Sequence, residues 1–183
     1  MGDEHMRTED DIKLDYCDVL IRPKRSILES RKEVDLNRTF KFKNGMEWTG
    51  VPIAAANMDT IGTIEMGKVL SEFGMLTCLS KHIKHLPDDD SYRNRDMAIS
   101  FGMSEEDKHS LLSHDGSLVT GEYSECKDFF CLDVANGYTQ RFVDFIKEVR
   151  EKWPEKILIA GNVVTTEMTE ALLLAGADII KIG

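Results

Sequence analysis

The sequence predicts an α/β fold in which a parallel sheet alternates with helices and an antiparallel hairpin comes first. Three observations support this prediction. Six apolar runs of strand length recur from residue 51 onward, segments with helical periodicity separate most of them, and polar residues follow the strands directly. Strands that are apolar throughout are buried on both faces, which is typical of a parallel sheet covered by helices.

The hairpin is expected before the sheet. Residues 39–43 alternate polar and apolar side chains, Asn44-Gly45 follows, and residues 46–49 continue the pattern. Asn-Gly between alternating segments indicates a hairpin because both residues tolerate positive φ. We therefore expect residues 1–50 to form an acidic tail, a basic segment and a hairpin that covers one end of the main domain, residues 51–183.

The strands of the sheet are expected at residues 51–56, 75–79, 98–101, 129–132, 157–160 and 178–182. The clearest helix lies over 142–149, where apolar residues recur at i, i+3, i+4 and i+7. A second helix runs over 168–175 and is followed by Gly176, a residue typical of the position just after a helix. A capping-box pattern at residues 104–107 indicates the start of a third helix.

A TIM barrel and a doubly wound sheet both fit this alternation. The polar residues at the strand ends favour the barrel, which gathers all of these ends around one mouth, and no GxGxxG motif follows any strand. A closed barrel of this kind has eight strands, whereas the sequence supplies about six. We interpret the fold as an incomplete TIM (β/α)8 barrel preceded by a hairpin. The polar strand ends are Asn57, Asp59, Lys81, His82, Asp133, Asn136 and Asn162.

The composition narrows the class of protein. The formal net charge is −10, which disfavours non-specific binding to nucleic acid because such binding neutralises phosphates with basic residues. No segment resembles a signal peptide or approaches the roughly 20 apolar residues of a membrane span. We expect a cytosolic protein that binds neither nucleic acid nor membrane.

The cysteines and histidines do not predict a metal site. The cysteines show no CxxC or zinc-like spacing, and those inside apolar runs, Cys78 and Cys131, are expected to be buried. We therefore assign no metal ligand. The other residues considered are Cys17, Cys126, His82, His85, His109 and His114, of which the last two are expected on an exposed helix.

Five motifs occur in order along nearly the whole chain: LDYCDVLIRPKRS (14–26), AANMDTIGT (55–63), CLDVANGY (131–138), AGNVVT (160–165) and GADIIKIG (176–183). Together they resemble the N-terminal part of the guanosine monophosphate (GMP) reductases of the IMP dehydrogenase/GMP reductase family. The IMP dehydrogenases have similar versions of several of these motifs. The features that favour the reductase are the RPKRS segment, Asn57 before Met-Asp-Thr, DVANGY and the lack of room for a regulatory insert.

The resemblance implies a TIM-barrel enzyme of purine salvage that reduces GMP with NADPH to IMP and ammonia, with a potassium ion and a homotetrameric assembly. In the family a cysteine thiolate attacks C2 of the purine, ammonia departs, and hydride reaches C2. That cysteine lies in a loop of the form GPGSxCxTR after the strand matching GADIIKIG, as do the potassium ligands. The resemblance thus assigns no catalytic residue to residues 1–183, which we expect to be inactive alone.

Two other functions remain open at this point. One is a fragment of an IMP dehydrogenase, which would use NAD and water in place of NADPH. The other is a non-catalytic, truncated form that binds full-length subunits.

The resemblance also implies cofactor-binding residues: Ser30, Arg31, Lys81, Asp133, Val134 and Ala135. Ser30 and Arg31 would reach the cofactor of a neighbouring subunit, where an arginine fork suits the 2′-phosphate of NADPH. From the residues alone, a solvated surface charge is the favoured interpretation of Arg31, and the resemblance reverses it.

The other assigned residues also have simpler interpretations. Lys81 could be a Schiff-base or a surface lysine, and Ser80 stands where the family has histidine before it. Asp133 ends an apolar strand, so its carboxylate either caps the next turn or faces a ligand. Met58 could pack under the purine, although Met more often fills a core.

Overall fold

The structure is a computed structural model, and it describes residues 10, 12, 14–83, 96–112 and 128–183. The chain divides into two compact units, Met1–Asp35 and Leu36–Gly183. Within its described residues the first unit contains two short 3-10 helices, η1 (Tyr16–Asp18) and η2 (Arg31–Glu33). The acidic tail predicted at the N-terminus lies almost wholly outside the described residues.

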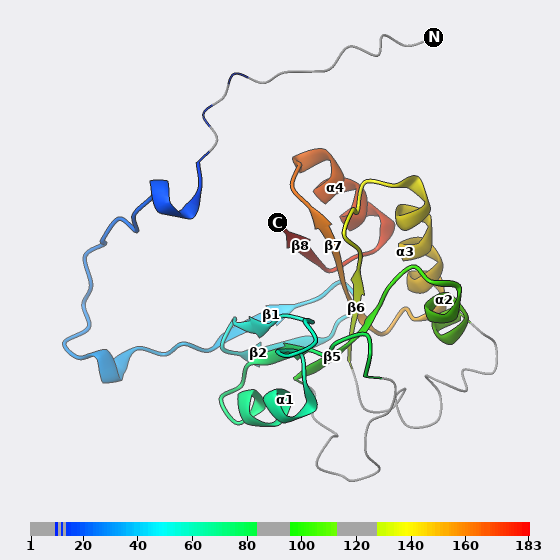
Figure 1. The fold of residues 1–183 in the computed structure, drawn as a ribbon. Coiled ribbons are helices and arrows are strands. Elements are labelled where there is room, and N and C mark those ends of the chain that lie inside the picture. Colours follow the sequence, from blue (N-terminus) through cyan, green and yellow to red (C-terminus); the bar gives the residue numbers. More distant parts are fainter. Residues whose placement is uncertain (1–9, 11, 13, 84–95, 113–127) are drawn as a thin grey trace. The chain divides into compact units, whose positions relative to one another are not determined.

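The second unit contains a parallel sheet of six strands. Each strand pairs only with its neighbours in the chain, in the order β3-β4-β5-β6-β7-β8, and the strands form an arc (Figure 1). A doubly wound sheet would reverse direction at a switch point, so the order confirms the predicted half-barrel of TIM type. All six predicted strands are confirmed, as β3 (Ala54–Ala55), β4 (Leu76–Cys78), β5 (Met97–Phe101), β6 (Phe129–Asp133), β7 (Ile157–Val163) and β8 (Ile179–Ile182).

Four α-helices connect or flank these strands, and each begins after a serine or threonine cap. Thr139, for example, accepts a hydrogen bond at Oγ1 from the backbone N–H of Phe142 at 3.3 Å. The helix that we predicted to end at Gly176 does so, with a left-handed φ of 116° at that residue. The three predicted helices are confirmed as α2 (Glu105–Leu112), α3 (Gln140–Lys152) and α4 (Thr166–Ala175). A further helix among the described residues, α1 (Ile64–Ser71), was not predicted individually.

Alternate residues of β5, β6, β7 and β8 face two separate apolar cores. In β6, Phe130 and Leu132 pack with the helices in an outer core that also contains Phe142 and Phe145 of α3. Phe129 and Cys131 face the inside of the arc instead. This burial on both faces explains why the strands read as continuous apolar runs. The inner core consists of Leu76, Cys78, Ala98, Phe129, Cys131, Ile157 and Ile159.

The hairpin pairs β1 (Arg38–Lys41) with β2 (Glu47–Gly50) in antiparallel register, as predicted. Of the two turn residues, which both tolerate positive φ, Gly45 adopts it, at 85°, and its N–H donates to the Phe42 carbonyl at 3.0 Å. Asn44 has no positive φ. Its Oδ1 accepts from the Met46 N–H at 3.0 Å, and its Nδ2 donates to the Glu155 carbonyl at 2.7 Å.

The hairpin covers the amino-terminal end of the sheet. Phe42 and Trp48 both meet Phe129 edge-on, with ring centroids 6.1 and 6.5 Å apart. Since Phe129 is the first residue of β6, these rings lie under the inner core. The prediction that the hairpin covers one end is confirmed. The hairpin also belongs to the same compact unit as the sheet, and a domain boundary at residue 50 stays a prediction.

A half-buried arginine fixes the start of β8. Arg150 in α3 donates to the Gly176 carbonyl from Nε at 2.9 Å and to Asp178 Oδ2 from Nη2 at 2.5 Å. Asp178 Oδ2 also accepts from the backbone N–H of Leu158 in β7, at 2.9 Å. The approach to β8 is thus tied to both α3 and β7, which sets the register of the strand that carries Lys181.

Candidate functional site

The inner face of the sheet becomes polar at its carboxyl edge. Along β6 the inward-facing residues are Phe129, Cys131 and finally Asp133. Asp133 pairs with Gly161 of β7, and Gly161 pairs with Lys181 of β8, so these three residues occupy one row across the sheet. In a TIM barrel this edge carries the functional residues. The row therefore lies where a ligand is expected.

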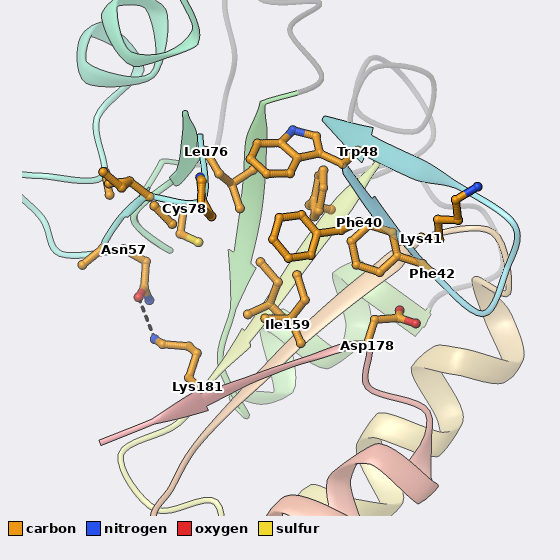
Figure 2. A pocket seen from close by; sticks show the side chains of 17 residues that line it. Phe40, Lys41, Phe42, Trp48, Asn57, Leu76, Cys78, Ile159, Asp178 and Lys181 are labelled. Atoms are coloured by element: carbon orange, nitrogen blue, oxygen red, sulfur yellow. Dashed lines mark hydrogen bonds between the residues drawn. The ribbon is translucent and has the colours of Figure 1, made fainter. Parts of the chain in front are cut away.

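Three side chains form a closed hydrogen-bonded network at this edge, which we call the Asn57–Asp133–Lys181 network. Lys181 Nζ donates to Asn57 Oδ1 at 2.9 Å and contacts Asp133 Oδ1 in an ion pair. Asn57 Nδ2 donates to Asp133 Oδ2 at 2.9 Å. Figure 2 shows the Asn57 and Lys181 side chains pointing toward each other across the inside of the arc.

The network joins the two edge strands of the sheet. Asn57 follows β3 and Lys181 lies in β8, and these strands are at opposite ends of the six-strand order. A hydrogen bond between them requires a strongly curled sheet and a side chain as long as lysine. The network thus depends on the barrel-like curvature rather than on any local motif.

A cavity of about 570 Å³ extends inward from the network. It is partly open, lies between the hairpin and the inner face of the sheet, and is lined mostly by apolar side chains, among them Phe40, Trp48 and Ile159 (Figure 2). Asn57 and Lys181 are the polar groups at one end of it. The polar edge and the apolar interior therefore meet at these two residues.

Two buried thiols lie beneath the network. Cys78 and Cys131 are 7% and 0% exposed, which confirms the prediction that both are buried. A hydrogen bond to Cys131, together with burial, raises the pKa of the Cys78 thiol. A raised pKa favours the protonated thiol, which is a weaker nucleophile than the thiolate.

The loop after β6 is held by backbone hydrogen bonds. The N–H of Val134 donates to the Gly161 carbonyl at 2.8 Å, and the N–H of Asn162 donates to the Val134 carbonyl at 2.9 Å. Val134 packs against the outer core, whereas Ala135 is exposed. Of the residues assigned from sequence, Asp133, Val134 and Ala135 therefore lie together on one fixed loop.

Lys81 follows β4 and is exposed. The residue before it, Ser80, is 2% exposed and donates from Oγ to Asp59 Oδ1 at 2.9 Å. This serine, which stands where the resemblance has a histidine, thus makes a hydrogen bond of its own to the loop after β3. The interaction fixes the backbone on which Lys81 lies.

The remaining assigned residues are exposed and are not part of the network. Met58 is 59% exposed in the loop after β3. Ser30 and Arg31 belong to the first compact unit, where Ser30 caps η2 by accepting from the Lys32 N–H at 3.3 Å. The cofactor and purine roles of all these residues stay predictions.

Sequence patterns assigned no role to Lys181 or Asn57. Lys181 could have been noticed as a charged residue within the apolar strand Ile179–Ile182. It lies two positions after the inward-facing Ile179 and therefore on the same face of the sheet. Asn57 was noted as a polar strand end, but its partner 124 positions away could not be read from the sequence.

The histidines and cysteines that the structure describes form no metal cluster. Among the described residues, no group of three or more His, Cys, Asp or Glu side chains could hold a metal ion. His82 Nε2 lies 3.8 Å from Asp59 Oδ1. His109 is exposed on α2, as predicted. His85, His114 and Cys126 lie outside the described residues.

No helix in the described part of the chain is long and apolar enough to cross a membrane.

Tyr138 connects the loop after β6 to the start of α4. Its Oη accepts from the backbone N–H groups of Val164 and Thr165 at 2.9 and 3.0 Å. The Thr165 hydroxyl, followed by these two N–H groups, lowers the pKa of the exposed Tyr138 phenol. These donors all stabilise the phenolate more than the phenol.

Comparison with known proteins gives relatives of one kind over nearly the whole chain. GMP reductase 1 of Rattus norvegicus is 48% identical over 183 residues, which is 97% of this chain and 51% of the relative. GMP reductase of Klebsiella pneumoniae is 47% identical over 97% of this chain and 52% of its own length. The chain thus spans about half the length of the curated relatives that it matches.

A domain family and a solved structure agree with these relatives. Residues 113–183 match the IMP dehydrogenase / GMP reductase domain. The crystal structure of inosine 5′ monophosphate dehydrogenase from Legionella pneumophila superposes with a TM-score of 0.69 at 26% identity. The match covers 91% of this chain and 49% of that one, and it supports the barrel-type fold.

We predict that Tyr138 ionises below the ordinary tyrosine pKa of about 10 in the folded protein. The difference in absorbance at 295 nm between the protein and its Tyr138→Phe variant, recorded against pH, isolates this residue from the other three of the four tyrosines. Thr165→Val should raise the midpoint, because it removes the largest cause of the shift. A midpoint at or above 10, or one unchanged by Thr165→Val, would contradict this prediction.

Proposed function

We propose that the chain, which is similar to GMP reductases and to the IMP dehydrogenase / GMP reductase domain, forms the amino-terminal, cofactor-binding part of an NADPH-dependent GMP reductase. One observation carries the choice of the reductase over the dehydrogenase. GMP reductases from a mammal and a bacterium are 47–48% identical to this chain along 97% of it, whereas the dehydrogenase of known structure is 26% identical.

The proposed reaction converts GMP to IMP. NADPH supplies a hydride to C2 of the purine, and the 2-amino group leaves as ammonia. The residues described here have the chemistry to hold such a cofactor. Asp133 is a carboxylate with a partly exposed side chain, an acceptor for N–H or O–H donors of a dinucleotide. Arg31 is exposed and carries the planar fork that suits a 2′-phosphate.

In this proposal each assigned residue has a separate task. Arg31, next to the cap residue Ser30, binds the 2′-phosphate of a cofactor held by a neighbouring subunit. Asp133, Val134 and Ala135 bind the cofactor at the carboxyl edge of the sheet, and Lys81 adds a positive charge at the end of β4. Met58 packs against the purine.

The assembly and the remaining cofactor also belong to the proposal. A homotetramer would place Arg31 of one subunit at the edge of the next. The potassium ion is proposed for the complete enzyme and has no ligand among the residues assigned here. A cytosolic location suits an enzyme of purine salvage.

The protein expressed from its complete coding sequence should oxidise NADPH only when GMP is present. The absorbance at 340 nm measures NADPH loss, and chromatography should find IMP and ammonia in amounts equal to it. Reduction of NAD with IMP as substrate, in the absence of GMP reduction, would contradict the proposal and favour the dehydrogenase.

Arg31→Ala should weaken the binding of NADPH more than that of NADH, because only NADPH carries the 2′-phosphate. The loss of one charge-assisted contact is roughly 1.5–3 kcal/mol, or at least about a tenfold rise in KM for NADPH. The matched control is Lys32→Ala, which removes the neighbouring exposed cation of η2 and should change KM little for either cofactor. If Arg31→Ala weakens the binding of NADPH and NADH equally, Arg31 does not bind the 2′-phosphate.

A further inference from the structure

We propose that Lys181 and Asn57 are positioning residues that hold the Asp133 carboxylate in one orientation for an N–H or O–H donor of the dinucleotide. The inference rests on the proposed function and adds to it two residues that act through Asp133. The observation behind it is the closed geometry of the Asn57–Asp133–Lys181 network.

Each Asp133 oxygen has a different partner. Oδ1 meets Lys181 Nζ, and Oδ2 accepts from Asn57 Nδ2 at 2.9 Å. Two fixed donors on the two oxygens define the plane of the carboxylate, which a single partner would not do. Lys181 and Asn57 are themselves joined at 2.9 Å, so neither donor can move without the other.

The network leaves hydrogen-bonding capacity for a ligand. A carboxylate offers about four acceptor positions, of which the network uses two. Lys181 has three N–H donors and Asn57 Nδ2 has two, so each keeps one N–H outside the network. The arrangement therefore presents oriented acceptors beside free donors, a combination suited to an amide or a hydroxyl group of a dinucleotide.

Lys181 and Asp133 form a partly buried pair of opposite charges. The side chains of Lys181 and Asp133, which form the ion pair at this edge, are 27% and 29% exposed. Removing one partner would leave the other charge incompletely solvated. Asp133 would then turn toward solvent, and its acceptors would lose their orientation toward the cofactor.

The neighbouring strand makes room for the lysine. A Cβ atom added at Gly161, between Asp133 and Lys181 in the row, would lie 2.5 Å from the Lys181 carbonyl oxygen and 2.7 Å from Lys181 Cβ. Only glycine fits there, and its missing side chain keeps the space between Asp133 and Lys181 open. The row is thus built so that the cation reaches the carboxylate across β7.

The test is a double-mutant cycle in the protein expressed from its complete coding sequence. Lys181→Met keeps most of the side-chain length and removes the charge, and Asp133→Asn keeps the shape and removes the negative charge. We expect each single variant to raise KM for NADPH at least tenfold and KM for GMP less than twofold. The double variant should be no worse than the poorer single variant, because both changes disrupt the same function.

Two further variants separate positioning from a general effect on the fold. Lys181→Arg keeps the cation and should recover at least half of the lost NADPH affinity. Lys147→Met removes a cation that pairs with Asp144 at 3.5 Å on the exposed face of α3, and it should leave KM for NADPH unchanged. Losses that multiply in the double variant would overturn the proposal, as would no effect of Lys181→Met.

Thermal unfolding without nucleotide distinguishes failure of this inference from failure of the proposed function. If the wild-type protein does not bind NADPH, the proposed function is wrong. The same cycle, measured as Tm, then still tests the network: coupled losses in Tm uphold it as a structural unit that serves another ligand. Additive losses in Tm overturn the network whatever the protein binds.

Discussion

The curl of the parallel sheet is the constraint on which the site depends. Asn57 follows the first strand of the sheet and Lys181 lies in the last, yet Asn57 Oδ1 and Lys181 Nζ meet at 2.9 Å. A flatter sheet with the same residues would keep each backbone hydrogen bond and lose the Asn57–Asp133–Lys181 network. The curvature follows from the right-handed twist of strands packed against an outer layer of helices. In this molecule, fold and site are linked through that curvature.

The two ends of the sheet differ in chemistry and in purpose. At the amino-terminal end, the hairpin places Phe42 and Trp48 against Phe129, and the contact is apolar and aromatic. At the carboxyl edge, the inward-facing side chains of β6 and β8 are the charged residues Asp133 and Lys181. Stability and ligand binding thus use opposite ends of the same strands, a division typical of TIM barrels. Changes at the hairpin should therefore alter stability before they alter the site.

Much of the fold could be predicted from the sequence because its signals are local. Phe142 and Val149 revealed α3 by their spacing, Gly176 marked the end of α4, and the apolar runs located all six strands. The turn at Asn44-Gly45 was predicted from these two residues, but the hydrogen bond of Asn44 to distant Glu155 could not be read from them. The network was missed for the same reason: no local pattern relates Asn57 to Lys181, and only the curved sheet brings them together. Ser30 and Arg31 stay predictions that rest on resemblance alone.

The hydrogen bond between the two edge strands offers the most direct test of the link between curvature and site. NMR of 15N-labelled protein can detect the Lys181 ammonium group, assigned by its loss in Lys181→Arg. The closed network predicts slow hydrogen exchange at this group, and a nuclear Overhauser contact to the Asn57 side-chain amide. An ammonium signal that exchanges as fast as that of exposed Lys147, with no contact to Asn57, would contradict it.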